Sequence, residues 1–310
     1  MSSNTREVTI SARELASLAG RPLKDGSQAR YNLSFGISTG GEPSSTAHYY
    51  ARWLSAFAEE LEQALGERVR FQIKLYKQFN EDEDTLASGT VDCMVLSAVD
   101  FLNAQSLAPG VTPMARVREV NAAVIFARTN AEVRELKDLA GKTIVFPDPD
   151  LPMSVWAKAR LVTAGLQSYH LRQSTDIADQ GLETGHLVIS FIETVNRVLR
   201  GEADAGVTYR ERFERCKHLG LVMLDHFPET PNVLATRQGL EPELVRAFTN
   251  AVRALERKPK VDLLTTHGAG PMVSVGNAEF APLRHAFELA RKFDGQPPGR
   301  HSTEPATVAK

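Results

Sequence analysis

Short β-branched segments alternate with amphipathic helical segments along most of the 310-residue chain, and this alternation constrains its fold more than any other feature. Val, Ile, Thr and aromatic side chains favour strands because they fit the pleated surface of a sheet. Strands that alternate with helices in this way imply βαβ units, and therefore an α/β fold with parallel strands. The expected strands are residues 31–37, 69–75, 92–96, 122–127, 143–146, 206–208, 221–224 and 233–235.

Two segments between these strands carry the clearest helical periodicity. In residues 46–65, apolar side chains from Tyr49 to Leu65 recur at spacings that place them on one face of a helix. Gly66 follows directly, as a glycine that ends a helix commonly does. Residues 243–257 repeat the same apolar spacing. We therefore expect a long amphipathic helix in each segment.

The length and charge of the chain limit the classes of protein to which it can belong. A single hydrophobic core of ordinary size holds about 100–150 residues, so 310 residues predict two lobes. The formal net charge of −2 gives no electrostatic reason to expect nucleic acid or an anionic membrane surface as a partner. No apolar run approaches the roughly 20 residues that a membrane-spanning helix needs, so no direct membrane insertion is expected.

The two ends of the chain differ in composition from the rest. Residues 1–30 are polar and irregular and are expected to form a loosely docked arm. Residues 296–310 are rich in Pro, Ser and Thr and are expected to form a flexible tail. The start of the chain has no apolar segment after a basic stretch, so it does not read as a secretory signal. Either the protein is cytoplasmic, or the chain does not begin at the start of the natural precursor.

The sequence contains none of the common motifs for catalysis or metal binding. There is no G-x-S-x-G, no H-E-x-x-H and no phosphate-binding P-loop. The only cysteines, Cys93 and Cys216, lack metal-ligand spacing and are expected to be free, with a single bridge between them as the alternative. We therefore expect no catalytic residue, no metal and no cofactor, and a protein that is not an enzyme.

One short pattern occurs twice. The sequence GTVDCMV at residues 89–95 resembles GEADAGV at residues 201–207, and each leads through a strand to a polar residue, Ser97 or Tyr209. One interpretation is a common helix-to-strand turn that uses glycine as the helix cap. The other is one such unit in each lobe, with both strand ends bordering a shared ligand cleft, because ligands of α/β sheets bind outside the carboxyl ends of strands.

Four segments together resemble a known family. They are FGIST at residues 35–39 with the helix after it, ASGTVDCMVLSAVDFLNA at 87–104, LKDLAGKTIVFPDPD at 136–150, and residues 195–215 with PNVLATRQGLEPELVRAF following. Their order and spacing are similar to those of the phosphate/phosphonate-type periplasmic substrate-binding proteins of ABC uptake systems. The L-x-D-L-x-G-K stretch before an apolar strand is typical of these proteins.

The resemblance implies a type II periplasmic-binding-protein-like fold, with two βαβ lobes joined by two hinge segments near residues 121–128 and 228–237. Lobe 1 would comprise residues 31–128 and 228–295, the second part including the C-terminal helices, and lobe 2 residues 129–227. The implied function is capture of a small molecule between the lobes for an ABC permease, in the periplasm. The alternatives are a ligand-sensing subunit for a kinase or regulator, and a cytoplasmic enzyme or metabolite-binding protein on the same fold.

Several positions depart from the polar phosphonate site that the family implies. Residues 150–154 read DLPMS, where the family has small hydroxyl residues, and their proline lacks an N–H donor. Phe79 and Phe101 stand where tyrosines are common, Phe191 falls near a family histidine, and Tyr209 falls near an acidic residue. Each hydrogen bond lost to a charged group costs roughly 1.5–3 kcal/mol. These departures favour a ligand with an apolar or aromatic part and one polar group.

The resemblance also places candidate ligand-binding residues at strand ends and helix starts. They are Ser38, Thr39, Phe79, Ser97, Phe101, Ser154, Glu193, Thr194, Tyr209 and Arg210. Most have a structural alternative: turns or helix caps for the serines and threonines, core packing for the phenylalanines, and an ion pair with a nearby glutamate for Arg210. Cys93 is either a small buried hydrophobic residue or, as in some sensor relatives, a thiol that binds a soft oxyanion.

Overall fold

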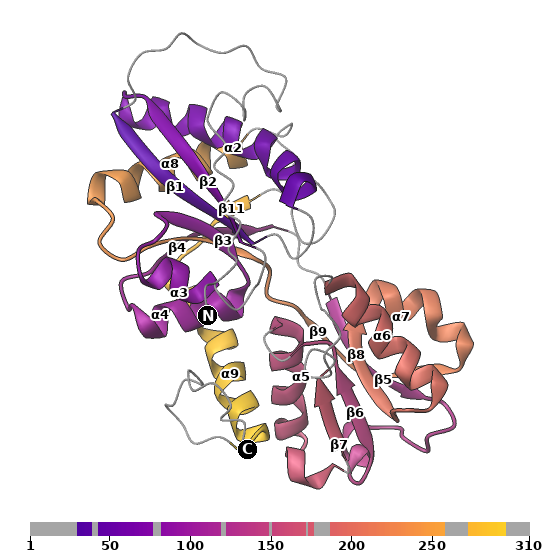
Figure 1. The fold of residues 1–310 in the computed structure, drawn as a ribbon. Helices are drawn as coiled ribbons and strands as arrows, with labels where there is room; N and C mark the ends of the chain where they lie inside the picture. The colour runs from indigo at the N-terminus through magenta and orange to yellow at the C-terminus, as the bar shows by residue number, and fades with distance from the viewer. Residues whose placement is uncertain are drawn as a thin grey trace, which may run out of the picture. The chain divides into compact units, whose positions relative to one another are not determined.

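The computed structural model describes residues 30–38, 43–76, 82–118, 122–148, 151–171, 173–176, 187–257 and 272–295. The chain divides into two compact units, and each contains its own sheet (Figure 1). Unit 1 comprises Met1–Asn121, Glu183–Leu187 and Thr230–Ala281, and unit 2 comprises Ala122–Leu182, Val188–Glu229 and Pro282–Lys310. None of the helices within the described ranges is long and apolar enough to cross a bilayer.

Unit 1 is built on a six-stranded sheet with the order β11-β4-β10-β3-β1-β2. Its strands are β1 (Tyr31–Ser38), β2 (Val69–Tyr76), β3 (Cys93–Leu96), β4 (Thr112–Val117), β10 (Val233–Thr236) and β11 (Met272–Ser274). β1, β2 and β3 run parallel, whereas β10 is antiparallel to β3 and β4. Its helical segments are α2 (Pro43–Leu65), α3 (Asp82–Ala87), α4 (Ala98–Leu107), α8 (Pro242–Glu256) and the 3-10 turn η6 (Asn277–Phe280).

The core of unit 1 is an aromatic cluster between the sheet and the helices α2 and α8. Phe57 is 0% exposed; its ring stacks on Trp53 with the centroids 4.8 Å apart and meets Phe248 of α8 edge-on at 5.3 Å. Phe71 of β2 completes the contact, at 5.9 Å from the Phe57 ring. The amphipathic periodicity of the two expected helices is thus confirmed, because their apolar faces meet in one cluster.

Unit 2 is built on a five-stranded sheet with the order β7-β6-β8-β5-β9. Its strands are β5 (Ala122–Arg128), β6 (Thr143–Phe146), β7 (Gln173–Asp176), β8 (Ala205–Tyr209) and β9 (Leu221–Pro228). β6 is parallel to β7 and β8, and β5 is antiparallel to β8 and β9. Its helical segments are η2 (Leu136–Leu139), α5 (Pro152–Thr163), η3 (Ser168–His170), α6 (Leu187–Arg200), α7 (Arg210–Cys216), η5 (Lys217–Leu219) and α9 (Ala281–Phe293).

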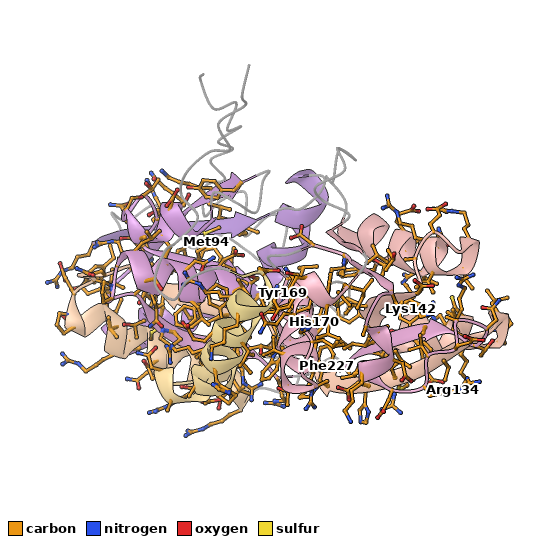
Figure 2. The ribbon with its side chains drawn as sticks, turned by 90° about the horizontal axis from the view of Figure 1, so that it is seen from below. Met94, Arg134, Lys142, Tyr169, His170 and Phe227 are labelled. Atoms are coloured by element: carbon orange, nitrogen blue, oxygen red, sulfur yellow. The ribbon has the colours of Figure 1, made fainter. Side chains whose placement is uncertain are left out.

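Side chains of unit 2 illustrate the contrast between its core and its surface (Figure 2). Phe227 of β9 is buried in the interior of the unit. Tyr169 of η3 is 70% exposed, and its ring meets that of His170 edge-on at 4.2 Å. Single exposed aromatic residues are common on protein surfaces, so Tyr169 alone does not indicate a binding site.

All eight strands expected from the sequence are present, some of them longer by one to several residues at an end. Three further strands, β4, β7 and β11, were not expected. β4 contains Pro113, β7 reads QSTD, and β11 has three residues, so none of them shows the alternating or β-branched pattern of a strand.

The two units differ from the expected lobes at several boundaries; residues 228–229, for example, were expected in lobe 1 but belong to unit 2. Residues 122–128 were expected in lobe 1, but β5 lies between β8 and β9 and so belongs to the unit 2 sheet. The last helix was also expected with lobe 1, but most of α9 belongs to unit 2. It is held there by an ion pair between Lys158 and Asp294 at 3.0 Å and by an edge-on contact between Phe146 and Phe293 at 6.1 Å.

The repeated G-x-x-D pattern forms the same local structure in both units. In unit 1, the N–H of Asp92 donates to the carbonyl of Ser34 at 3.0 Å, and its carboxylate accepts from the N–H of Ser34 and from Arg237 Nε, both at 2.8 Å. Each motif glycine, Gly89 or Gly201, has a positive φ of 76° or 81° and ends the preceding helical turn.

In unit 2, Asp204 makes the contacts that correspond to those of Asp92 in unit 1. Its N–H donates to the carbonyl of Thr143 and its carboxylate accepts from the N–H of Thr143, both at 2.9 Å, while Arg128 lies 3.7 Å from its other oxygen. Each aspartate thus connects the start of a central strand to the neighbouring parallel strand and to an arginine at the end of an antiparallel strand: Arg128 is the last residue of β5, and Arg237 directly follows β10. The motif occurs once in each unit, at the amino ends of β3 and β8.

We expect Asp92→Ala and Asp204→Ala each to lower the free energy of unfolding by about 1–3 kcal/mol, because each leaves a partly buried backbone N–H without its acceptor. Urea unfolding followed by circular dichroism would measure the loss. Glu211→Ala is the matched control: its exposed ion pair with Arg215 should contribute no more than about 0.5 kcal/mol. If the free energy of unfolding fell as little as in the control, the two aspartates would not stabilise the pairing of the strands.

Candidate ligand-binding site

Each sheet has one edge at which its parallel strands end, and this is where ligands of α/β sheets bind. In unit 1, β3 ends at Leu96, and β10 begins at the same edge because Val233 pairs with Leu96. In unit 2, β8 ends at Tyr209, opposite Ala123 of β5. We call these the carboxyl edges of the two sheets.

Both short connections between the units begin and end at a carboxyl edge. β4 ends at Val117, whose N–H donates to the carbonyl of Asn232 just before β10, at 3.1 Å. The chain then enters unit 2 at Ala122, which pairs with Pro228 at the end of β9. Residues that border these connections therefore lie at the edges where a ligand is expected.

Tyr209, Glu229 and Phe191 form a cluster at the carboxyl edge of unit 2. The Tyr209 hydroxyl donates to Glu229 Oε1 at 3.3 Å, and the Tyr209 ring meets the Phe191 ring edge-on with centroids 4.7 Å apart. Glu229 is 8% exposed and directly follows β9. The cluster combines two aromatic rings with one buried carboxyl group.

Both ionisable groups of this cluster are held in their neutral forms. Burial raises the pKa of Glu229 to about 8, although the hydrogen bond from Tyr209 acts in the opposite direction. Burial, with the nearby Glu229 carboxylate as a second cause, also raises the pKa of the Tyr209 phenol well above its usual range. At neutral pH the carboxyl edge therefore presents a carboxylic acid and a phenol, both uncharged.

Helix α5 begins at the same carboxyl edge, shortly after the end of β6. Its first residue is Pro152 and its N-cap is Leu151, so the N-cap role expected for Ser154 is wrong. Ser154 lies in the first turn and is 0% exposed, and its hydroxyl makes no hydrogen bond to the described residues. A buried hydroxyl without a partner costs free energy, so Ser154 is the predicted residue whose surroundings most favour a ligand contact.

Helix α6 uses its two predicted residues in structural contacts. The Glu193 carboxylate accepts from Arg200 at 2.7 Å and from Arg197 at 3.3 Å. Burial opposes the ionisation of Glu193, but the two arginines outweigh it and lower its pKa. Thr194 is buried and packs close to Gly206 of β8, where a Cβ atom would lie 2.8 Å from the Thr194 methyl group.

Arg210 follows Tyr209 directly as the first residue of α7, and its side chain is exposed. It lies near Glu214, whose pKa is lowered mainly by Lys217 and to a smaller degree by Arg210. This is the weak surface pairing considered for Arg210 from the sequence. Arg210 is thus an exposed residue that directly follows Tyr209 at the carboxyl edge.

The predicted residues of unit 1 have structural contacts where their side chains are described. Ser97 Oγ accepts from the N–H of Asp100 at 3.1 Å and so caps helix α4. Phe101 is 0% exposed and packs against Phe280 at 4.9 Å, which is the core role rather than an exposed position. Ser38 ends β1, but its side chain lies outside the described part of the structure, as do Thr39 and Phe79.

Cys93 is a buried structural residue. Its thiol lies 3.8 Å from the carbonyl oxygen of Ser34, and burial, followed by the charge of Asp92, raises its pKa well above the usual range. A thiol that stays protonated is a poor ligand for a soft oxyanion, so the structure favours the hydrophobic role. Within the described ranges, no group of three or more His, Cys, Asp or Glu residues could hold a metal ion.

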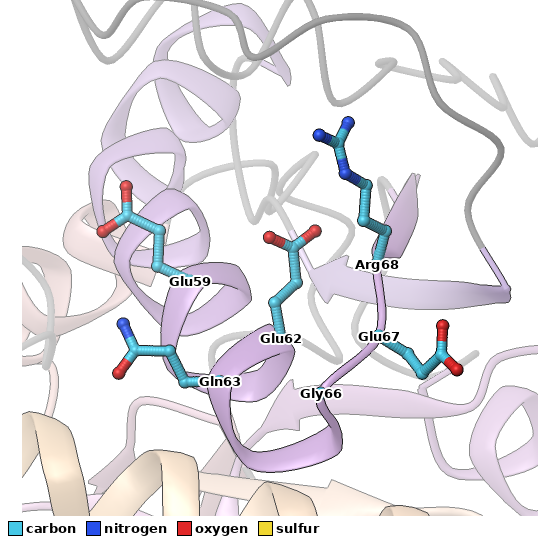
Figure 3. Close-up of a pocket in the computed structure, with 6 residues that line it drawn as sticks. All are labelled: Glu59, Glu62, Gln63, Gly66, Glu67 and Arg68. Carbon is cyan, nitrogen blue, oxygen red and sulfur yellow. The ribbon is translucent and has the colours of Figure 1, made fainter.

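A hollow on unit 1 lies at the wrong place for the ligand of an α/β sheet (Figure 3). It is lined by Glu59, Glu62, Gln63, Gly66, Glu67 and Arg68, and its volume is about 540 Å³. These residues belong to the end of α2 and to the turn that precedes β2, so the hollow is at the amino edge of the sheet. Glu62 there accepts a hydrogen bond from the N–H of Val69 at 3.0 Å, which is a structural contact.

Solved structures share this fold. A Xanthomonas citri protein bound to chloride ion is 12% identical, with a TM-score of 0.66 over 85% of this chain and 99% of the other. The binding protein component of an ABC phosphonate transporter from Pseudomonas aeruginosa is 14% identical, with a TM-score of 0.55 over 85% and 88% of the two chains. A Prochlorococcus marinus protein in complex with methylphosphonate is 15% identical, with a TM-score of 0.59 over 85% and 98%.

The solved structures place the fold among the type II periplasmic binding proteins, as expected from the sequence. A search of curated protein sequences found no match. The model of one family, described as "ABC transporter, phosphonate, periplasmic substrate-binding protein", matches residues 40–282, which is more than half of the chain. The family consists of transporter components that bind small ligands. The chain therefore belongs to the phosphonate-type family of periplasmic substrate-binding proteins of ABC transporters.

Proposed function

We propose that the protein captures a small molecule with an apolar or aromatic part and one polar group, and delivers it to an ABC permease in the periplasm. The observation that carries this proposal is the Tyr209–Glu229–Phe191 cluster at the carboxyl edge of unit 2. In this proposal the protein acts by binding alone and performs no catalysis.

The cluster suits such a ligand better than a simple phosphonate. A small phosphonate presents charge and little apolar surface, and its recognition needs several strong hydrogen-bond donors. The edge offers two aromatic rings and two neutral polar groups instead. The first turn of α5 adds one hydroxyl from Ser154, while Pro152 removes one of the N–H donors that a helix start presents to anions.

A thermal-shift screen of the full chain should therefore separate two groups of compounds. Aromatic and branched alkyl acids are expected to raise the melting temperature more than phosphate or methylphosphonate at equal concentration. A ligand at a hundredfold excess over its Kd stabilises the folded state by about 2.7 kcal/mol, which gives a visible shift.

Tyr209→Ala tests whether the response comes from this cluster. The variant removes the ring that contacts Phe191 and the hydroxyl that contacts Glu229, so the shift caused by aromatic acids should disappear. Tyr169→Ala is the matched control, because it removes an exposed tyrosine of the same unit. A larger shift with methylphosphonate than with any aromatic or alkyl acid would refute the proposed ligand class.

A further inference from the structure

Glu229 occupies an unusual position for a carboxyl group. It directly follows β9 and is the last residue of unit 2 before the chain passes to unit 1, yet its side chain is buried beside Tyr209 at the end of β8. Its Oε1 accepts a hydrogen bond from the Tyr209 hydroxyl at 3.3 Å. A buried carboxylate loses its hydration, and a single hydrogen bond does not offset that loss, so the ionised form of Glu229 is unfavourable.

Among the described residues, no charge near Glu229 offsets this cost. On β9, Asp225 pairs with Arg160 of α5 at 3.4 Å and His226 is exposed, and at the start of α7 Arg210 faces solvent. Among the described groups only burial and the Tyr209 hydroxyl act on the titration of Glu229. The carboxyl group therefore keeps its proton up to about pH 8, and it has one O–H to donate.

We propose that the protonated Glu229 is a specificity-determining residue that donates its O–H to a singly charged oxyanion, a sulfonate or a carboxylate, on the ligand. This inference rests on the proposed function and names the polar group of the ligand. The start of α5 supplies only about half a positive charge and Arg210 supplies one at the surface, which suits one negative charge better than two. A dianion would add repulsion wherever Glu229 ionises.

The inference predicts a specific pH dependence of binding. Isothermal titration of benzenesulfonate, which is fully ionised throughout, would be followed from pH 6 to pH 9.5. The affinity should be constant in the acidic range and should fall above about pH 8, approaching a tenfold loss per pH unit, because binding then requires a proton. Glu229→Gln carries a neutral donor at every pH, so its affinity should not depend on pH in this range.

Two further variants separate this role from a general structural one. Tyr209→Phe removes the hydrogen bond that lowers the pKa of Glu229, so the fall in affinity should begin at a higher pH. Glu211→Gln changes an exposed glutamate of unit 2 and should keep the wild-type profile.

The outcomes distinguish this inference from the proposed function. A wild-type affinity independent of pH, or a Glu229→Gln profile that falls like the wild type, overturns the role of the proton. If other solutes bind but benzenesulfonate does not, the inferred polar group is wrong while the proposed function stands. If no aromatic or alkyl acid in the screen binds at any pH, both are wrong.

Discussion

Replacing Glu229 with glutamine should stabilise the protein relative to wild type by an amount that grows as the pH rises. The pKa of Glu229 is about 8 in the folded protein, against the ordinary 4.5 that the carboxyl regains on unfolding. The folded state therefore holds the proton more tightly, so the stabilising contribution of Glu229 is fully present below pH 4.5 and is lost as the pH rises through 8. At about 1.4 kcal/mol per pH unit, the whole loss is about 4–5 kcal/mol.

The glutamine side chain does not titrate, so Glu229→Gln escapes this loss. Its free energy of unfolding minus that of the wild type should increase by about 4 kcal/mol between pH 5 and pH 9, measured by urea unfolding. Other titrating groups are common to both proteins and cancel in the difference. For Glu211→Gln the difference should stay within about 0.5 kcal/mol at each pH. Parallel curves for Glu229→Gln and wild type would show that Glu229 is ionised in the folded state at neutral pH.

The sequence predicts the fold well because the strands and helices that carry it bury apolar side chains in regular patterns. β6 and β10 are four-residue runs that are buried throughout, and each is visible as an apolar segment between polar ones. β7 reads QSTD and has no such pattern; the structure pairs it in parallel with β6 at the edge of the unit 2 sheet. The sequence could not predict that pairing.

The site was only partly predictable for a related reason. Tyr209 could be predicted as a candidate because it follows the expected strand 206–208 in a repeated motif. Glu229 was missed because a glutamate is normally exposed, and its burial depends on β9 and β8 ending on either side of β5. The one available signal was that Glu229 follows the apolar residues Phe227 and Pro228 in the expected crossing segment.

Several residues predicted to bind the ligand instead make structural contacts in the described part of the chain. The N–H of Asp100 donates a hydrogen bond to Ser97 Oγ at the start of α4, and the Phe101 ring packs against the Phe280 ring. Position relative to a strand end shows that a residue is near the carboxyl edge. It does not show whether the side chain turns toward that edge or into the core.

Truncating Phe57 to alanine should have the largest effect of any core substitution in unit 1. Its ring is fully buried and contacts Trp53, Phe71 and Phe248, so α2, β2 and α8 all meet at this one side chain. Removing a buried phenylalanine ring leaves a cavity and typically costs about 3–5 kcal/mol. Because unit 2 has a core of its own, around residues such as Phe126 and Phe213, the loss should be confined to unit 1.

Hydrogen exchange with mass spectrometry can resolve the two units, since it reports opening segment by segment. In Phe57→Ala, amides of β1 and β2 should exchange much faster, while those of β5 and β8 should keep their wild-type protection. Leu107→Ala is the matched control in unit 1, because this leucine is largely exposed and its truncation should cost less than about 1 kcal/mol. Equal acceleration in β5 and β8 would mean that the two cores unfold as one cooperative structure, in which case the division into two independently stable units is wrong.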